Sequence, residues 1–177
     1  MKDSDPFQQA SNAALRFLSH RPRSEAEVRT RLGRRFPPPI VDRVLGDLRD
    51  RGLVNDAEFA SLWRDSRSSL NPKSAASIRR ELAAKGVARD IADDAVRNMD
   101  DLDSACRAGR RLAQRLASCD FTSFHGRLRG HLQRRGFSTS VARRAISLLW
   151  DEQSADAPAP SRDDGDTGLA PAGRAGS

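Results

Sequence analysis

The sequence predicts an all-α protein made of three tandem three-helix repeats, about nine helices, in an elongated, curved arrangement with a disordered C-terminal tail. Apolar residues between positions 13 and 150 recur at helical spacing, and neither strand-like alternation nor an Asn-Gly or Asp-Gly hairpin signal interrupts them. Capping residues and glycines divide this stretch into short helices. Matching residues return every 50 positions, which indicates an internal repeat.

The first repeat opens with the amphipathic stretch 13–18. Ser24 and Glu27 then form a capping box, because the serine hydroxyl can accept from the amide of Glu27 while the glutamate reaches back. Three prolines at 37–39 end this second helix at Arg35 or Phe36, since proline disfavours helical geometry in the preceding residue.

The second and third repeats contain the same signals. Their opening amphipathic stretches are 59–63 and 105–113. Asn55 with Glu58 repeats the capping box, and Ser74 and Ser138 are further N-cap candidates. The glycines that suit a left-handed position after a helix are Gly52, Gly86 and Gly136.

Residues in register at the 50-residue spacing define the repeat. The expected matches are Val28, Ile78 and Leu128; Leu32, Leu82 and Leu132; Phe36, Gly86 and Gly136; Pro37, Val87 and Phe137; and Val41, Ile91 and Val141. A unit of about 50 residues barely supports its own core, so stacked neighbours must supply the remaining stabilisation. The expected segments are a flexible N-terminus (1–9), helical repeats 1, 2 and 3 (10–50, 51–104 and 105–152), and a disordered acidic tail rich in Ala, Pro and Gly (153–177).

Charge is distributed unevenly along the chain. Lysine plus arginine number 31 against 24 acids, a net of +7 with a sequence pI near 10.7, which suggests an anionic partner, nucleic acid above all. The three repeats have net charges of +4, −1 and +7, and the tail has −2. The acidic tail could compete with an anionic ligand for the basic repeats, or serve solubility alone.

Several functional classes are not expected. No apolar run approaches the roughly 20 residues that span a bilayer, and the first residues form no secretory signal. Cys106 and Cys119 lack a disulfide or metal-binding pattern, and His125 and His131 are not at the i, i+4 spacing of two metal ligands on a helix. No phosphate-binding loop or nucleophile elbow occurs. We therefore expect a cytoplasmic protein that is not an enzyme and has no cofactor, metal or membrane contact.

Four stretches contain further motifs: residues 14–28 (ALRFLSHRPRSEAEV), 52–60 (GLVNDAEFA), 78–87 (IRRELAAKGV) and 132–138 (LQRRGFS). In this order and spacing they resemble the bacterial RecX family of regulatory proteins over roughly residues 12–150. The chain departs from the family pattern at Phe36, which three prolines follow where a Lys-Gly or Arg-Gly turn is usual, at Asn55 where Asp is commoner, and at residues 71–73 where a glycine loop is frequent.

The resemblance implies a protein that binds the RecA recombinase, chiefly as a filament on single-stranded DNA, lying in the filament's helical groove. It implies inhibition, in the main, of the ATPase, strand-exchange and co-protease activities of RecA in recombination, DNA repair and the SOS response. Some members of the family contact DNA directly. The resemblance implies no catalytic residue, and we expect a monomer.

Arginines are the binding candidates, because the planar guanidinium pairs bidentately with phosphate or carboxylate. The candidates for RecA or DNA binding are Arg79, Arg80, Lys85, Arg127, Arg129, Arg134, Arg135, Arg143 and Arg144. The alternative for each is a solvated head on a stem packed at the edge of the core. Trp63 and Trp150 are either core residues or interface anchors.

Two other functions remain open at this stage. Residues 24–54 have the pattern of a helix-turn-helix, which is typical of a sequence-specific transcription regulator, although a threefold repeat is unusual for that class. A passive helical scaffold is also compatible with the repeat, but it leaves the uneven charge unexplained.

Overall fold

The computed structural model describes residues 5–156, and this part of the chain forms nine α-helices and no strand. The helices group into three modules of three. Their bounds are α1 (Pro6–Leu18), α2 (Glu25–Gly33) and α3 (Pro38–Asp50); α4 (Asp56–Leu70), α5 (Ala75–Ala84) and α6 (Arg89–Val96); and α7 (Asp101–Arg115), α8 (Phe121–Arg134) and α9 (Thr139–Asp156). The predicted all-α fold of three tandem repeats is confirmed.

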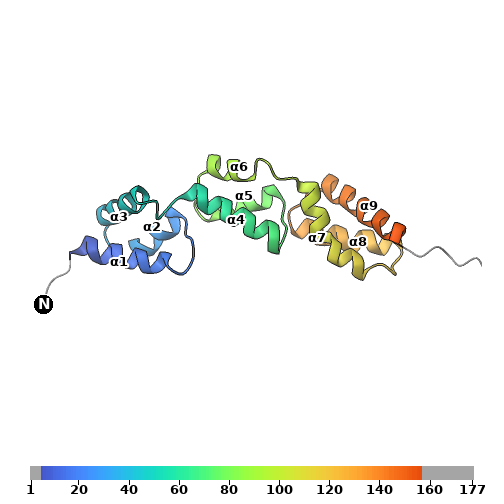
Figure 1. Cartoon of the computed structure of the whole chain (residues 1–177), viewed down its shortest axis with the longest axis horizontal. Coiled ribbons are helices and arrows are strands. Elements are labelled where there is room, and N and C mark those ends of the chain that lie inside the picture. Colours follow the sequence, from blue (N-terminus) through green and yellow to red (C-terminus); the bar gives the residue numbers. More distant parts are fainter. Residues whose placement is uncertain (1–4, 157–177) are drawn as a thin grey trace, which may run out of the picture.

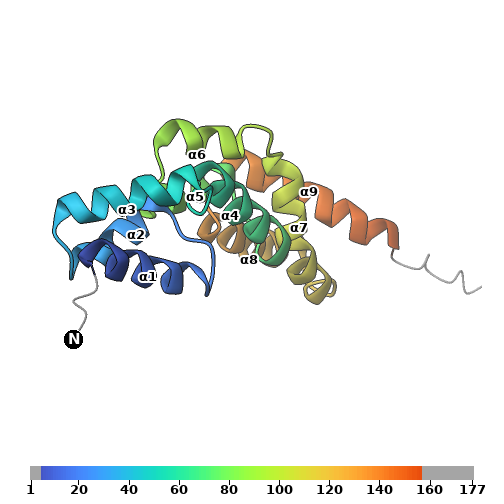
Figure 2. The same ribbon diagram turned by 60° about the vertical axis from the view of Figure 1, so that its left-hand side comes forward.

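The modules lie in a row and form a shallow arch (Figure 1). Turning the molecule by 60° keeps the same order of modules, with the second and third overlapping in this view (Figure 2). Each module has its own hydrophobic core. Within the described residues, no helix combines the length and hydropathy needed to cross a membrane.

In addition to Phe124 on α8, the central helix of each module contributes a pair of fully buried residues to that core. These are the predicted pairs Val28 and Leu32, Ile78 and Leu82, and Leu128 and Leu132, all at most 1% exposed. They are four residues apart, so they occupy the same helix face. The i, i+4 columns of the repeat are therefore confirmed.

The turn after the central helix is one residue shorter in the first module than in the others. Val87 donates its amide to the carbonyl of Leu82, five residues back, and Gly86 between them has a φ of 77°. In the first module the amide of Phe36 reaches the carbonyl of Leu32, only four residues back. Arg35, not a positive-φ glycine, directly precedes Phe36, and the prolines follow at once.

This shorter turn corrects the later columns of the predicted repeat. Phe36 corresponds to the buried Val87 and Phe137, not to Gly86 and Gly136 as the uniform spacing implied. The matching buried residues of the third helices are accordingly Val41, Ala92 and Ala142, rather than Val41, Ile91 and Val141.

Neighbouring modules join end to end through their central helices. The hydroxyl of Ser24, the N-cap of α2, donates to the carbonyl of Lys85, the C-cap of α5, over 2.6 Å. The hydroxyl of Ser74, the N-cap of α5, donates to the carbonyl of Gly136 beyond α8 over 2.7 Å. Both serines are at most 1% exposed. The partial positive charge of one helix start thus meets the partial negative charge of the next helix end.

A carboxylate from the following module completes each junction. Asp56, the first residue of α4, accepts from the amide of Glu25 over 2.9 Å, and Asp101, the first residue of α7, accepts from the amide of Ala75 over 2.8 Å. These amides belong to the first turn of α2 and α5, which has no partner within its own helix. Each module therefore caps the central helix of the module before it.

Glycine is required at each junction, in the turn whose carbonyl accepts from the serine. A Cβ on Gly86 would lie 2.3 Å from the Cβ of Ala26, and a Cβ on Gly136 would lie 2.9 Å from the hydroxyl oxygen of Ser74. Both glycines also have positive φ values. The first module lacks this glycine, and no module of the described chain docks on the end of α2.

An ion-pair network braces the first junction. Glu27 accepts from Arg21 over 2.8 Å, from Lys85 of the second module over 3.0 Å and from the amide of Ser24 over 3.3 Å, which closes the predicted capping box. Burial raises the pKa of Glu27, but these donors outweigh it and lower the pKa to about 2. Of the second predicted capping box, the described structure contains only the Asn55 half, which caps α4.

The expected segment boundaries differ from the observed helices in three places. The first helix begins at Pro6, inside the segment expected to be flexible, because Asp5 caps it and proline suits the first helical position. The third module begins at Asp101 instead of 105, and α9 extends to Asp156 instead of 152. The rest of the predicted tail, residues 157–177, lies outside the described residues.

The junction glycine can be tested with a series of alanine substitutions. Gly86→Ala adds both positive-φ strain and the clash with Ala26, so we expect a loss of about 2–4 kcal/mol in the free energy of unfolding. Gly52→Ala, with a φ of 65° but open space around it, should cost about 1–2 kcal/mol. Gly33→Ala, which has neither feature, should be close to neutral. Urea denaturation measures all three, and equal losses at Gly52 and Gly86 would contradict a tight junction.

The stabilising effect of Glu27 depends on pH. Its pKa is lower in the folded state than the ordinary value of 4.5, so its contribution is complete above pH 4.5 and is lost as the pH falls towards 2. Glu27→Gln should therefore unfold more easily at pH 7, by up to about 3 kcal/mol, and the difference should shrink below pH 4.5. Glu58→Gln, at an exposed position, should change stability by less than about 0.5 kcal/mol at either pH.

Candidate anion-binding surface

The structure separates the candidate bases by what their charges contact. Lys85 pairs with Glu27 in the first junction, so its charge is neutralised inside the protein. Arg79 pairs with Asp93 over 2.8 Å between α5 and α6. Arg80 is exposed and lies at the second junction, where its guanidinium is 3.1 Å from the position of a Cβ on Gly136. Arg79 and Lys85 are thus less available to a partner than their charges alone suggest.

Arg135 is half-buried at the second junction. Its guanidinium donates to Nδ1 of His131 over 3.3 Å, and Nε2 of His131 donates to the carbonyl of Ala108 over 3.0 Å. Burial lowers the pKa of His131, and nearby arginines lower it further. Burial likewise lowers the pKa of Arg135, with a further contribution from Arg134. The neutral histidine therefore orients the Arg135 guanidinium.

The remaining candidates form an exposed set on the last two helices. They are Arg127, Arg129 and Arg134 on α8, and Arg143 and Arg144 on α9. Within residues 5–156, none of them forms an ion pair. Unpaired, solvated guanidinium groups attract phosphates and carboxylates, so these five side chains form the exposed arginine surface of the third module.

A cavity of about 560 Å³ lies between the second and third modules, beside residues 68–72. The basic residues that line it are Arg107, Arg111, Arg115, His131 and Arg135. The three arginines of α7 are four residues apart and therefore share one helix face. They are not among the candidates predicted from the sequence, although this i, i+4, i+8 spacing indicates a shared face.

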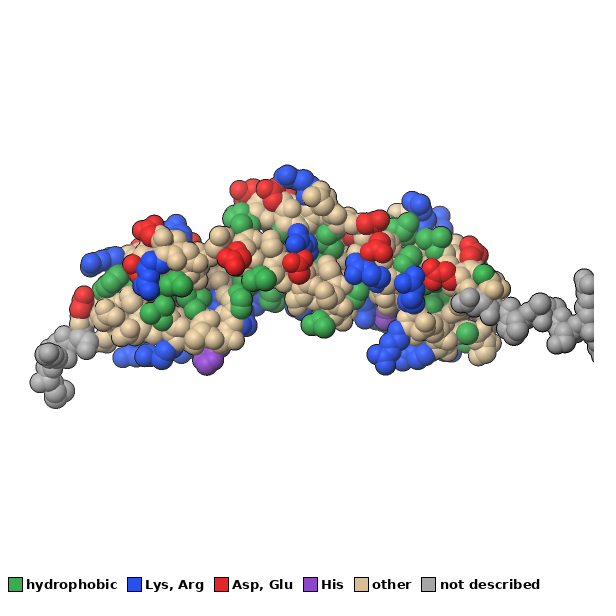
Figure 3. Space-filling view, viewed as in Figure 1, with side chains coloured by type: hydrophobic (Ala, Val, Ile, Leu, Met, Phe, Trp, Pro, Cys, Tyr) green, Lys and Arg blue, Asp and Glu red, His purple; other side chains and the backbone are tan. Residues whose placement is uncertain are grey.

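A second basic cavity, of about 620 Å³, lies in the first module between α1 and α2. It is lined by Arg16, His20, Arg23, Arg31, Arg34 and Arg35, none of which was selected from the sequence. The net charge of +4 in the first repeat is the sequence feature that indicates a basic site there. In the space-filling view, Asp and Glu side chains gather on the upper half, interspersed with Lys and Arg, whereas the lower edge of the first and last modules carries Lys and Arg (Figure 3).

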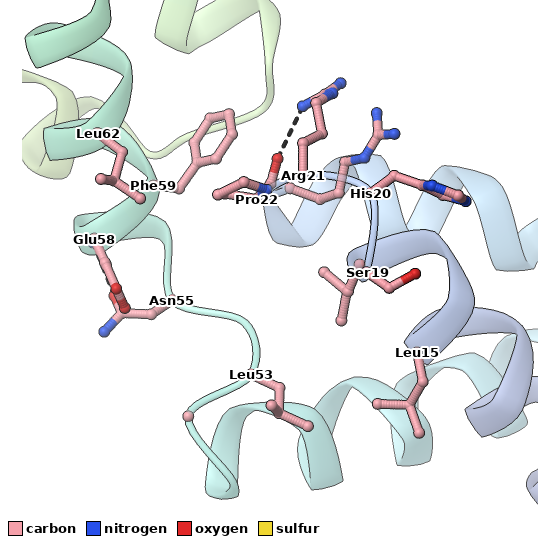
Figure 4. A pocket seen from close by; sticks show the side chains of 13 residues that line it. Leu15, Ser19, His20, Arg21, Pro22, Leu53, Asn55, Glu58, Phe59 and Leu62 are labelled. Carbon is pink, nitrogen blue, oxygen red and sulfur yellow. Dashed lines mark hydrogen bonds between the residues drawn. The ribbon is translucent and has the colours of Figure 1, made fainter.

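A third cavity, of about 640 Å³, is mainly apolar. Leu15, Leu53, Phe59 and Leu62 line it between α1, the α3–α4 linker and α4 (Figure 4). On its rim Arg21 donates to the carbonyl of Pro22 over 2.9 Å. His20, Arg21, Arg23 and Glu58 also line this cavity.

The two tryptophans considered as interface anchors, Trp63 and Trp150, have contacts within the fold. The indole of Trp63 donates to Glu81 over 2.9 Å, and Trp150 packs edge-on against Phe121 and Phe124. Burial raises the pKa of the Cys106 thiol. In the described part of the chain, no group of three His, Cys, Asp or Glu residues could hold a metal ion.

Comparisons with known proteins give a consistent picture. Residues 10–48 match the family model described as the first three-helix domain of RecX, and residues 55–96 match that of the second. Regulatory protein RecX of Mycobacterium ulcerans is 36% identical over 143 residues, which cover 76% of this chain and 81% of that protein. Its counterpart in Streptomyces coelicolor is 31% identical, with 86% of this chain and 83% of that protein covered.

Other relatives are longer or more distant. Regulatory protein RecX of Listeria welshimeri is 30% identical over 149 residues, but this chain spans only 55% of its length. The crystal structure of RecX from Lactobacillus salivarius has a TM-score of 0.72 and 24% identity, covering 82% of this chain and 97% of that one. The similarity to this solved structure supports the fold.

The cavity between the second and third modules can be tested as an anion site. Arg111→Glu should weaken binding of a single-stranded oligonucleotide about tenfold at low salt, because it places an acid among the cavity arginines. Arg89→Glu is the matched control, since Arg89 is 93% exposed and lies 3.6 Å from Asp93. Fluorescence anisotropy measures both, and equal weakening would show that only net charge matters.

Proposed function

Because the chain belongs to the RecX family of regulatory proteins, we propose that it binds the RecA recombinase, chiefly as a filament on single-stranded DNA. It inhibits the ATPase, strand-exchange and co-protease activities of RecA, and so acts in recombination, DNA repair and the SOS response. It does so as a cytoplasmic monomer, without catalysis and without a cofactor. The observation that supports this proposal most directly is the similarity, over most of the chain, to proteins named Regulatory protein RecX.

The shape and charge of the molecule support a long, anionic partner. A row of three modules offers a continuous surface that suits a filament better than a small ligand (Figure 1). Basic cavities lie in the first module and at the second junction. The exposed arginine surface of the third module adds further unpaired charge at the other end of the row.

A helix-turn-helix regulator is less compatible with the same residues. In that class the second helix enters the major groove, and here it would be α3. This helix contains Asp42, Asp47 and Asp50 but only two arginines, so it would repel the DNA phosphates. The N-terminus of α2 is also engaged with the second module through Ser24.

Titration of RecA with the protein tests the proposed function. ATP turnover by RecA on single-stranded DNA should fall at substoichiometric amounts of the wild-type chain. Charge reversal of Arg127 and Arg134 together should raise the half-inhibitory concentration about tenfold or more, because both are exposed and unpaired.

The matched control reverses Arg89 and Arg97, which have ion-pair partners in the second module, and it should change inhibition little. Arg135 is unsuitable for this test because its contact with His131 belongs to the junction. Unchanged ATP turnover across a wide titration of the wild-type chain would refute the proposal.

A further inference from the structure

The first two modules share an ion pair between their second and third helices. In the first, Arg29 contacts Asp42 and also Glu25, the latter over 3.3 Å. In the second, Arg79 contacts Asp93 over 2.8 Å. The same two helix positions thus bring a guanidinium and a carboxylate together twice.

The third module has different residues at the corresponding positions. The positions directly after the first residue of the buried i, i+4 pair (Val28, Ile78 and Leu128) are Arg29, Arg79 and Arg129. The positions directly after the matching buried residue of the third helices are Asp42, Asp93 and Arg143. The acid of the pair has therefore become an arginine, and both side chains are exposed.

No other acid compensates for this exchange. The position of Glu25, four residues before Arg29, is His125 in the third module, whose ring is tilted by 45° against that of Phe121 with the centroids 5.8 Å apart. Neither Arg129 nor Arg143 forms an ion pair within the described residues. Two like charges at positions that otherwise attract each other are unfavourable unless an anion lies between them.

We propose that Arg129 and Arg143 form an anion clamp that holds phosphate groups of a single DNA strand in the place of the missing carboxylate. Guanidinium groups bind phosphate bidentately, and two of them at this position can contact non-bridging oxygens from both sides. The inference rests on the proposed function for its setting, and it names the group that the third module binds there.

A nucleic-acid backbone fits the surroundings of the clamp better than an acidic protein segment does. Arg127, Arg134 and Arg144 extend the unpaired charge over both helices. A strand with one negative charge at every nucleotide can satisfy such a spread of cations, whereas one carboxylate satisfies a single site.

Arg143→Asp is the decisive variant, because it rebuilds the ion pair of the other two modules and therefore should fold normally. It removes two cations from the clamp, one by substitution and one by pairing with Arg129. Binding is measured with a labelled single-stranded oligonucleotide, without RecA. The slope of log affinity against log salt concentration should decrease in magnitude by about 1.4. At 0.1 M salt this corresponds to an affinity about 25-fold weaker. Arg144→Asp, the same charge change one residue away, should lose about 0.7, or about fivefold.

The reverse exchange is expected to create a second clamp. Asp93→Arg removes the acid opposite Arg79, so oligonucleotide affinity should rise more than about fivefold. Equal effects of Arg143→Asp and Arg144→Asp would overturn the clamp. Unchanged oligonucleotide binding by Arg143→Asp together with lost inhibition of RecA would also overturn it, and would assign the pair to an acidic protein surface.

The inference and the proposed function fail separately. A wild-type chain that binds the oligonucleotide through the clamp but leaves RecA turnover unchanged would refute only the regulatory function. If the chain inhibits RecA while its oligonucleotide binding does not depend on Arg129 and Arg143, only the clamp is refuted.

Discussion

The architecture depends on the contact between the capped start of one central helix and the last turn of the next. A buried serine satisfies two requirements there, since it caps its own helix and donates to a carbonyl that would otherwise lack a partner. A buried hydroxyl or carbonyl without a partner costs free energy, so these bonds favour a fully formed junction. The positive-φ glycine that lets the helices approach is part of the same contact. Because the junction is repeated, three small cores become one row.

The junctions also determine which charges remain for a partner. Lys85 is neutralised by Glu27, and Arg135 is oriented by a neutral His131. The middle module, whose bases are largely paired, acts mainly as a connector between two basic ends. Net charge along the sequence is therefore a poor guide to individual residues, whereas the pairing of each arginine separates structural cations from available ones.

Terminal modules differ from the middle one for a physical reason. The end of α2 receives no neighbour in the described chain, so Phe36 and the prolines can replace a glycine turn there without a clash. A terminal repeat is exempt from the constraint that its neighbours obey. The first repeat can therefore depart from the family pattern at this turn without disturbing a junction.

The sequence alone determined the helical class, the three repeats, the buried i, i+4 pairs and the capping serines, because these follow from local periodicity and from hydrogen bonds within one turn. It also indicated the basic third module. Only the tertiary structure showed that Ser24 and Ser74 bond across modules, that the first turn is one residue short, and that the α7 arginines face a cavity. The two serine bonds join residues more than 60 positions apart, and no local pattern specifies which distant carbonyl or carboxylate a side chain will meet. The short turn is local, but the uniform 50-residue spacing concealed it.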